Sequence, residues 1–153
     1  MHKRLKAEVR NITIENRATI IEPCNLYYCY LGDNCFVGPF CEIQKDVFIG
    51  KNTRIQSHSF ICSEVTIGDN CFIGHGVMFT NDKFNSNTPE LLPTIIGNNV
   101  LIGSGAVILP VNICDYTIIG AGAVVTKDIK EPGTYAGNPA RKINDRINKP
   151  TVE

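Results

Sequence analysis

The sequence predicts an all-β protein, a parallel β-helix of about five to six triangular coils with one inserted loop and a short C-terminal extension. Three observations carry this prediction. Residues 31–84 divide without a gap into nine consecutive units of six residues. The first residue of each unit is large and apolar, and the fifth is small in eight of the nine units. Residues 85–95 form the one break in the series.

A period of six fits neither a helix, whose apolar stripe recurs every 3.6 residues, nor a hairpin sheet with irregular loops. In a parallel β-helix each six-residue unit makes one flat side and three sides close a coil, and coils stack about 4.8 Å apart. The large side chain then fills the interior and the small one faces it near a corner. Glycine is frequent at the second position, as at Gly50 and Gly68. We expect it to support the turn, because glycine adopts backbone conformations that other residues avoid.

The same rhythm extends in both directions from residues 31–84. Before them lie units at 14–19, 20–25 and 26–30, and after the break come units at 96–101, 102–107 and 108–112, then units beginning at 113, 119 and 125. We therefore expect a single domain over residues 1–153, with repeats at about 12–130, an inserted loop at 85–95 and a cap or tail at 131–153. After Arg141 we expect a short helix or a frayed end, and the extension covers the open edge of the last coil.

Composition excludes several function classes. Fifteen basic and fifteen acidic residues cancel, and no cationic run is present, which argues against a nucleic-acid partner. No apolar stretch approaches the roughly 18 residues of a membrane span, and no signal-peptide core follows the N-terminal charges, so we expect a cytoplasmic protein. The seven cysteines contain no C-x-x-C pair. Cys35, Cys41 and Cys71 occupy the small fifth position, which predicts small core residues.

Stacking the units by coil brings distant residues together. His75 is the third residue of its unit and lies above Ser57 and below Ser104 and Ala121. His58 lies about one coil away on the same side. Because polar residues beside an inserted loop are a usual place for function on a regular scaffold, this edge is a candidate site.

Asn81 is the third residue of the next unit, with Ser63 beneath it and Lys127 two coils above. It is followed by Asp82 and then by the inserted loop. We expect His75, Asn81 and Asp82 to gather around one corner.

Four segments carry a family resemblance: "GVMFTNDKF", "IGSGAVILP", "IGAGAVVTKDI" and "AGNPARKI". With the repeat, over about residues 12–140, they resemble bacterial nucleotide-sugar N-acetyltransferases of the left-handed β-helix, hexapeptide-repeat type. The resemblance implies a left-handed coil and a homotrimer. It also implies acetyl transfer from acetyl-CoA to an amine, often at C3, of a UDP- or dTDP-linked deoxy sugar destined for surface polysaccharide. The Asn of the family's T-N-D motif contacts the acceptor near its reacting amine, and that role is implied for Asn81.

The candidate catalytic residues are Asn81, His75 and Asp82, and the candidate acceptor-binding residues are Asn81, His58 and Lys83. His75 is the best candidate base, since imidazole titrates near working pH, and Asp82 is placed to orient it. Two alternatives stay open. In the first, His75 and His58 are solvated surface residues without a role in catalysis. In the second, Asn81–Asp82 is an ordinary turn that enters the loop.

The late coils are the candidate cofactor site. Glycine and alanine stand in "IGSGAV" and "IGAGAV" where bulky residues would fill an outer groove, so a pantetheine arm has room against the backbone. The resemblance places this cofactor between two subunits. The candidate cofactor-binding residues are Gly103, Ser104, Ala121 and Ala123, with Lys127, Arg141 and Lys142 for the CoA phosphates. The alternative for the three cations is ordinary solubilising charge.

The implied reaction needs no metal, because an amine attacks a thioester and backbone N–H groups near Gly74 or Gly103 can meet the oxyanion. A metal-dependent β-helix carbonic anhydrase is a rival, but His2 lies outside the repeat, which leaves only His58 and His75 as imidazole ligands. A non-enzymatic solenoid with a binding face is a second rival, although the outward residues are mixed. An O-acetyltransferase of the serine, galactoside or antibiotic type is the closest alternative; such enzymes resemble this chain but carry a His near a loop that ends in "HP".

Overall fold

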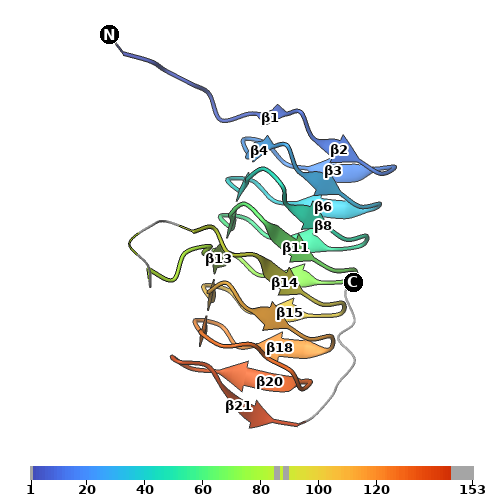
Figure 1. Ribbon diagram of the computed structural model, residues 1–153. Coiled ribbons are helices and arrows are strands. Elements are labelled where there is room, and N and C mark those ends of the chain that lie inside the picture. Colours follow the sequence, from blue (N-terminus) through green and yellow to red (C-terminus); the bar gives the residue numbers. More distant parts are fainter. Residues whose placement is uncertain (1, 85–86, 88–89, 146–153) are drawn as a thin grey trace.

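The computed structural model describes residues 2–84, 87 and 90–145. Every regular element within these residues is a short β-strand, and the strands form a column of stacked coils (Figure 1). Among the described residues there is no helix long and apolar enough to cross a bilayer.

Three sheets run along the column, one for each side of the prism. Sheet A contains seven strands: β1 (Val9–Arg10), β4 (Asn25–Tyr27), β7 (Glu42–Ile43), β10 (Phe60–Ile61), β13 (Met78–Phe79), β16 (Val107–Ile108) and β19 (Val124–Val125). Sheet B contains β2 (Thr13–Ile14), β5 (Tyr30–Leu31), β8 (Phe48–Ile49), β11 (Val65–Ile67), β14 (Thr94–Ile96) and β17 (Asn112–Ile113). Sheet C contains β3 (Ala18–Ile20), β6 (Cys35–Val37), β9 (Arg54–Ile55), β12 (Phe72–Ile73), β15 (Leu101–Ile102), β18 (Thr117–Ile119), β20 (Gly133–Ala136) and β21 (Arg141–Asn144).

The chain visits sheets A, B and C in turn, and the strands of successive coils pair in parallel. In sheet C, for example, Ile73 pairs with Ile55 on one side and with Ile102 on the other. The predicted parallel β-helix is therefore confirmed. Sheet A holds seven strands, so the chain makes seven coils where five to six were expected. The additional coil arises because regular pairing begins at Val9, before the first recognisable unit. The hand of the coil stays a prediction.

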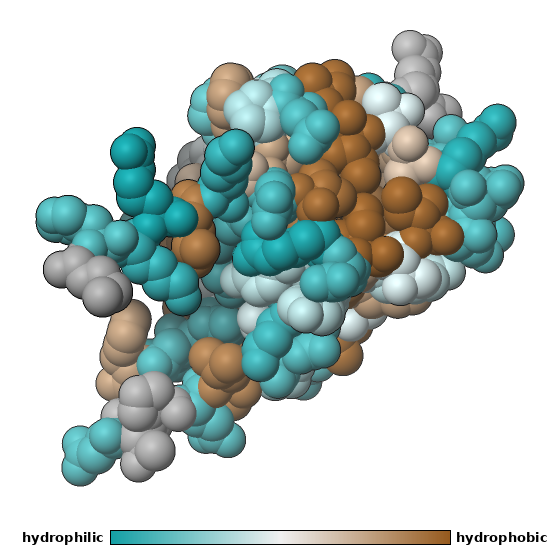
Figure 2. Space-filling model, turned by 90° about the horizontal axis from the view of Figure 1, so that it is seen from above, coloured by the Kyte–Doolittle hydropathy of each residue, from teal (hydrophilic) through white to brown (hydrophobic). Residues whose placement is uncertain are grey.

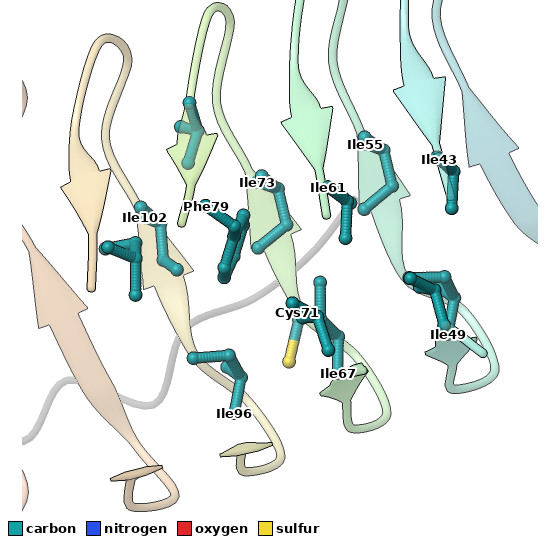
Figure 3. Close-up of a cluster of buried hydrophobic side chains, with 14 of the residues drawn as sticks. Ile43, Ile49, Ile55, Ile61, Ile67, Cys71, Ile73, Phe79, Ile96 and Ile102 are labelled. Atoms are coloured by element: carbon teal, nitrogen blue, oxygen red, sulfur yellow. The ribbon is translucent and has the colours of Figure 1, made fainter. Parts of the chain in front are cut away.

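The core is a column of large apolar side chains. Figure 3 shows Ile55, Ile73 and Ile102 stacked in one row of this column. Each of them is fully buried, with 0% of its surface exposed. Burying one such side chain contributes about 1.5–3 kcal/mol, and the repeat supplies one on every side of every inner coil.

The small fifth residues line the same interior near the corners, and their polar atoms are satisfied by the next coil. The Thr53 hydroxyl donates to the Gly68 carbonyl oxygen at 2.8 Å, and the Cys71 thiol to the Gly97 carbonyl oxygen at 3.1 Å. The prediction that Cys35, Cys41 and Cys71 are core residues is confirmed, because each is at most 2% exposed. Burial raises the pKa of these three thiols to about 11, so they stay protonated at neutral pH.

The second-position glycines were expected to adopt a backbone conformation that other residues avoid, and this reason is wrong. Positive φ angles occur two residues later, for example at Asn52 (57°) and Asn70 (56°). At Gly68 a Cβ would instead lie 2.6 Å from the Gly97 carbonyl oxygen of the next coil. Glycine is therefore required at Gly50 and Gly68 by the close approach of two backbones.

The inserted segment leaves the solenoid at the end of β13 and returns at β14, so it comprises residues 80–93. Thr94 and Ile95, which were expected in the loop, belong to β14. The Leu92 N–H donates to the Asn81 carbonyl oxygen at 2.8 Å and closes the base of this segment. Residues 85, 86, 88 and 89 of the predicted loop lie outside the described residues.

Sheet C ends in a strand hairpin beyond the last coil. β20 pairs in parallel with β18, and β21 pairs antiparallel with β20. The helix or frayed end expected after Arg141 is therefore wrong for Arg141–Asn144, which find backbone partners in β20. Residues 146–153 lie outside the described residues.

Candidate functional site

The predicted site residues lie at two different corners of the prism. The first, which we call the glycine corner, joins sheet C to sheet A and carries Gly76, Gly105 and Gly122 on successive coils. The second, which we call the loop corner, follows β13 and comprises residues 80–84. Strand β13 runs between the two corners.

The glycine corner is an open strip of backbone. Gly76, Gly105 and Gly122 have φ angles of 65°, 72° and 69°, and a Cβ added at any of them would meet no atom within 4 Å. One coil earlier the same position carries His58, whose ring lies 4.9 Å from that of Phe40. The corner thus changes from aromatic side chains in the early coils to bare backbone in the last three.

His75, Ser104 and Ala121 stack beside this strip as the repeat predicts. The Gly105 N–H donates to the His75 carbonyl oxygen and the Gly122 N–H to the Ser104 carbonyl oxygen, each at 2.9 Å. All three stacked residues are exposed. They present an imidazole, a hydroxyl and a methyl group along one open edge.

Gly103 and Ala123, which were also predicted to bind the cofactor, are less exposed than these three residues. Gly103 is half-buried directly before Ser104. Ala123 is 0% exposed, because its methyl group occupies the small inward position of the core. The Ala123 methyl group is therefore not accessible from outside, and a role of Ala123 in cofactor binding stays a prediction.

The three predicted phosphate-binding cations are also separated. The Ala140 N–H donates to the Val124 carbonyl oxygen at 2.8 Å, which brings the exposed Arg141 next to the end of the glycine corner. The Lys142 ammonium lies 3.2 Å from Glu131 and 2.7 Å from Asp145. The hydrogen bond to Asp145 raises the pKa of Lys142 above its ordinary value. Lys127 follows β19 and therefore stands above the loop corner.

The loop corner contains a groove of about 500 Å³. Its walls are mainly apolar, formed by Phe60, Met78, Phe84 and Leu109, and its polar residues are Thr80, Asn81, Asp82 and Lys83. Asn81 is half-buried, and its carboxamide has no hydrogen-bond partner among the described residues. A carboxamide both donates and accepts hydrogen bonds, so Asn81 can offer both to a ligand in the groove that it lines.

Asp82 and Lys83 are part of the turn that leads into the loop. The Asp82 carboxylate accepts the Phe84 N–H at 2.7 Å, which is the turn geometry typical of Asp. Lys83 is exposed. The turn interpretation of Asp82 is thus confirmed, and its carboxylate is directed to its own backbone.

His75 and Asn81 do not share a corner within one subunit. They flank β13 and are six residues apart, a span of about 20 Å in extended chain. The expectation that His75, Asn81 and Asp82 gather around one corner is therefore wrong for a single chain. The reason is geometric, because a six-residue unit takes the chain from one corner to the next.

Sequence reasoning did not identify the apolar wall of the groove. The outward residues of sheet A change along the column, from polar in the early coils to apolar in the later ones: Asn25, Glu42, Phe60, Met78, Val107 and Val124. This change at one position of the unit was a usable signal. Within the described part of the chain, no three His, Cys, Asp or Glu side chains lie close enough to hold a metal ion.

Comparison with known proteins places this geometry in a family. The model "Bacterial transferase hexapeptide (six repeats)" matches residues 28–63 and 46–81, and "Hexapeptide repeat of succinyl-transferase" matches residues 93–127. The bifunctional protein GlmU of Limosilactobacillus fermentum is 37% identical over 116 residues, which are 74% of this chain and 24% of the relative. This chain therefore spans about a quarter of that relative's length.

Two further proteins show the likeness over most of the chain. A Lysinibacillus sphaericus protein described as a probable macrolide acetyltransferase is 35% identical over 137 residues, 83% of this chain and 68% of the relative. The fold is similar to that of a mutant form of AntD, an N-acyltransferase from Bacillus cereus, in complex with dTDP-4-amino-4,6-dideoxyglucose and coenzyme A. There the TM-score is 0.73 at 24% identity, covering 92% of this chain and 83% of the other. The repeat, its matches to two hexapeptide models and these relatives show that the chain belongs to the bacterial hexapeptide-repeat transferase family.

Proposed function

We propose that this protein is an acyltransferase that moves an acetyl group from acetyl-CoA to the amine of a UDP- or dTDP-linked amino sugar used in surface polysaccharide synthesis. The observation that carries the proposal is Asn81, whose carboxamide has no hydrogen-bond partner among the described residues and which lines a groove where the inserted segment leaves the solenoid. Relatives described as acetyl- or acyltransferases support acyl transfer as the reaction class.

The residues around Asn81 suit an acceptor of this kind. The groove pairs an apolar wall of Phe60, Met78 and Leu109 with the Asn81 amide, which suits a deoxy sugar with a methyl group on one side and an amine on the other. The AntD structure, whose fold this chain shares, was solved with a dTDP-linked amino sugar. Asn81 is assigned to orient the acceptor amine by a hydrogen bond.

The chemistry is a direct transfer. The lone pair of the neutral amine attacks the thioester carbonyl carbon, and the carbonyl electrons move to oxygen. The C–N bond is complete when the C–S bond breaks, and the CoA thiolate takes up the proton that the amine nitrogen loses. A backbone N–H directed at the oxyanion lowers the barrier in a site without bulk water. The N–H groups of Gly74 and Gly103 themselves are not available for this, because they donate to the Ile102 and Ile119 carbonyl oxygens of the next coil at 2.8 Å.

His75 is assigned to accept the proton from the amine and pass it to the thiolate. Its exposed side chain stands at the first of the three open glycine positions. Imidazole suits this role because its ordinary pKa lies near neutrality. Asp82 does not orient His75 in this proposal, since its carboxylate accepts the Phe84 N–H.

The pantetheine arm is assigned to the glycine corner. Ser104 and Ala121 line this edge, and the absence of side chains at Gly105 and Gly122 leaves backbone groups accessible to the amide groups of the arm. Arg141 stands at the far end, where the CoA phosphates would lie. Lys142 is already paired with Glu131 and Asp145, so we assign it a structural role.

The separation of the two corners favours a homotrimer. His75 and the glycine corner of one subunit meet Asn81 and Lys127 only if a neighbouring subunit supplies the second set. Three prisms around a threefold axis provide three such shared sites. In that arrangement Lys127 reaches the cofactor of the adjacent subunit.

The test is an acceptor screen with acetyl-CoA and thiol release as the readout, on the wild type, Asn81→Ala, His75→Ala and the control Asn112→Ala. Asn112 is exposed on sheet B and does not line the loop-corner groove. We expect Asn81→Ala and His75→Ala each to lower kcat/KM for the amino sugar by about 10- to 100-fold, or 1.4–2.7 kcal/mol. Equal activity in all four proteins would remove the site assignment.

O-Acetyl transfer is the second candidate. It is favoured by the L. sphaericus relative, whose described acceptor class, a macrolide, is rich in hydroxyl groups. The same screen separates the two functions when each amino sugar nucleotide is paired with its hydroxyl analogue. Faster thiol release with the hydroxyl analogue would establish O-acetyl transfer.

A further inference from the structure

The two ends of the solenoid are finished differently. At the C-terminal end, β20 and β21 extend sheet C, Ile129 bridges to Ile113 of β17, and the Val124 N–H of β19 donates to the Gly137 carbonyl oxygen, whereas β1, β2 and β3 are outermost strands with no such partners among the described residues. One backbone edge of each of these three strands has no strand partner among the described residues. The core is also open at this end, because Ile14 is 38% exposed while Leu31 and Ile49, which follow it in the same row, are 0% exposed.

This open end is an apolar surface. Figure 2 looks onto it and shows a continuous hydrophobic area beside a hydrophilic rim. The first coil contributes four partly buried and two exposed apolar side chains at this end: Val9, Ile12, Ala18 and Ile20, then Ile14 and Ile21. An apolar area with unpaired strand edges is typical of a protein–protein contact.

Residues 2–8 form an arm that leads away from this end (Figure 1). All of its residues are exposed, and Leu5 exposes 80% of its surface. The arm carries Lys3, Arg4 and Lys6 before its first acidic residue, Glu8. Seven residues span about 23 Å when extended, which is more than one side of the prism.

The rim of the first coil has charges that match the arm. Glu15 and Glu22 are exposed there, and neither forms an ion pair within the described residues. The two arginines of the first coil are held by the second coil. Arg10 donates to the Asn25 side chain at 3.0 Å, and Arg17 lies 3.8 Å from Asp33. Among the charges of the arm and the first coil that have no ionic partner within the described residues, Lys3, Arg4 and Lys6 of the arm outnumber its Glu8, and Glu15 and Glu22 of the rim outnumber Arg10, whose partner Asn25 is neutral. The arm is therefore net positive and the rim net negative.

We propose that the first coil is an interface at which two copies of this chain meet end to end, each laying its arm across the first coil of the other. Leu5 covers part of the apolar surface around Ile14. Lys3, Arg4 and Lys6 lie near Glu15 and Glu22 of the other copy. The arm backbone supplies hydrogen bonds to the open strand edges, which is strand addition between copies. Each arm runs away from its own first coil (Figure 1), and the first coil of a second copy offers the net negative rim and the apolar surface that match it.

This inference does not depend on the proposed function, and mass rather than activity tests it. Sedimentation velocity of the full chain at low salt compares the wild type, an arm variant (Lys3→Glu, Arg4→Glu and Lys6→Glu), a rim variant (Glu15→Lys and Glu22→Lys) and the protein with all five changes. Leu5→Asp is a second arm variant that cannot disturb the core, since Leu5 is exposed. The matched control exchanges three exposed lysines elsewhere, Lys45→Glu, Lys51→Glu and Lys130→Glu.

We expect the wild type and the control to have twice the particle mass of the arm variant, the rim variant and Leu5→Asp. The protein with all five changes, whose charges are reversed on both sides, recovers the wild-type mass. The same mass for all of these proteins would overturn the proposal. Hydrogen exchange that shows the arm protected without any doubling of mass would also overturn it, because the arm would then cover its own coil.

Discussion

The close approach of successive coils at the second-position glycines predicts a large and specific loss of stability for Gly68→Ala. A Cβ at this position would lie 2.6 Å from the Gly97 carbonyl oxygen and 2.8 Å from its carbonyl carbon, and would also meet the Asn98 side-chain oxygen. The two Gly97 atoms are backbone, directly after β14, and are fixed in the next coil. The new methyl group cannot push them aside as it could a flexible side chain.

The magnitude follows from the distances. Ordinary contact begins at 3.4 Å, so the two backbones must separate by about 0.8 Å at this point. That movement lengthens the hydrogen bond from the Gly68 N–H to the Ile96 carbonyl oxygen, now 2.9 Å. Overpacking costs about 1–3 kcal/mol and a weakened backbone hydrogen bond about 0.5–1.5 kcal/mol, so we expect a loss of about 2–4 kcal/mol.

Gly122→Ala is the matched control. Its Cβ would meet no atom within 4 Å, and its cost is limited to holding alanine at a φ of 69°. That conformation costs about 1 kcal/mol. The two variants add the same methyl group to a glycine of the same repeat, so their difference isolates the close approach.

The assay is urea unfolding followed by circular dichroism, at one protein concentration for all three proteins. We expect Gly68→Ala to lose at least about 1 kcal/mol more free energy of unfolding than Gly122→Ala. If Gly122→Ala is equally or more destabilised, the close-approach explanation for the second-position glycines is wrong.

Three further predictions follow. Burial raises the pKa of five thiols from 9.0 to about 11, those of Cys29, Cys35, Cys41, Cys62 and Cys71. Their contribution to the free energy of unfolding is therefore complete below pH 9 and is lost as the pH rises through 11. The midpoint of urea unfolding should fall between about pH 8 and about pH 10.5, and an unchanged midpoint would contradict the burial argument. Ala121→Leu places a larger side chain on the edge of the glycine corner and should raise KM for acetyl-CoA several-fold with little change in KM for the acceptor, as steady-state kinetics would show; an equal rise in both would place the cofactor elsewhere. Incubation with EDTA or 1,10-phenanthroline, followed by gel filtration, should leave acetyl transfer unchanged, whereas a loss that zinc restores would revive the metal-dependent alternative.

The regular part of the fold could be read from the sequence because it is a local rule repeated many times. Ile55, Ile73 and Ile102 each open a unit, and each is fully buried in the same row. The candidate site could be read only in part. The stacking of His75 with Ser104 and Ala121 follows from counting in sixes, and so does the position of Asn81 beside the loop.

Other features depend on how the coils meet and were not accessible to counting. Ala123 and Ala121 have the same side chain two positions apart, but one fills the core and the other is exposed. Lys142 was predicted to bind phosphate, but in β21 its ammonium group lies beside Glu131 and Asp145. The separation of His75 from Asn81 is likewise a property of the closed triangle.

The sequence alone determined the six-residue period, the inward-facing residues and the residues that stack on one another in successive coils. A hydrophobic repeat of six residues buries its large side chains by stacking each unit on the equivalent unit of the next coil. Only the tertiary structure decided why glycine stands at the second position, which corner each polar side chain occupies, and which end of the column stays open. These depend on distances between backbones and on which charges find partners. Such distances are fixed by the packing of whole coils, and no single unit contains them.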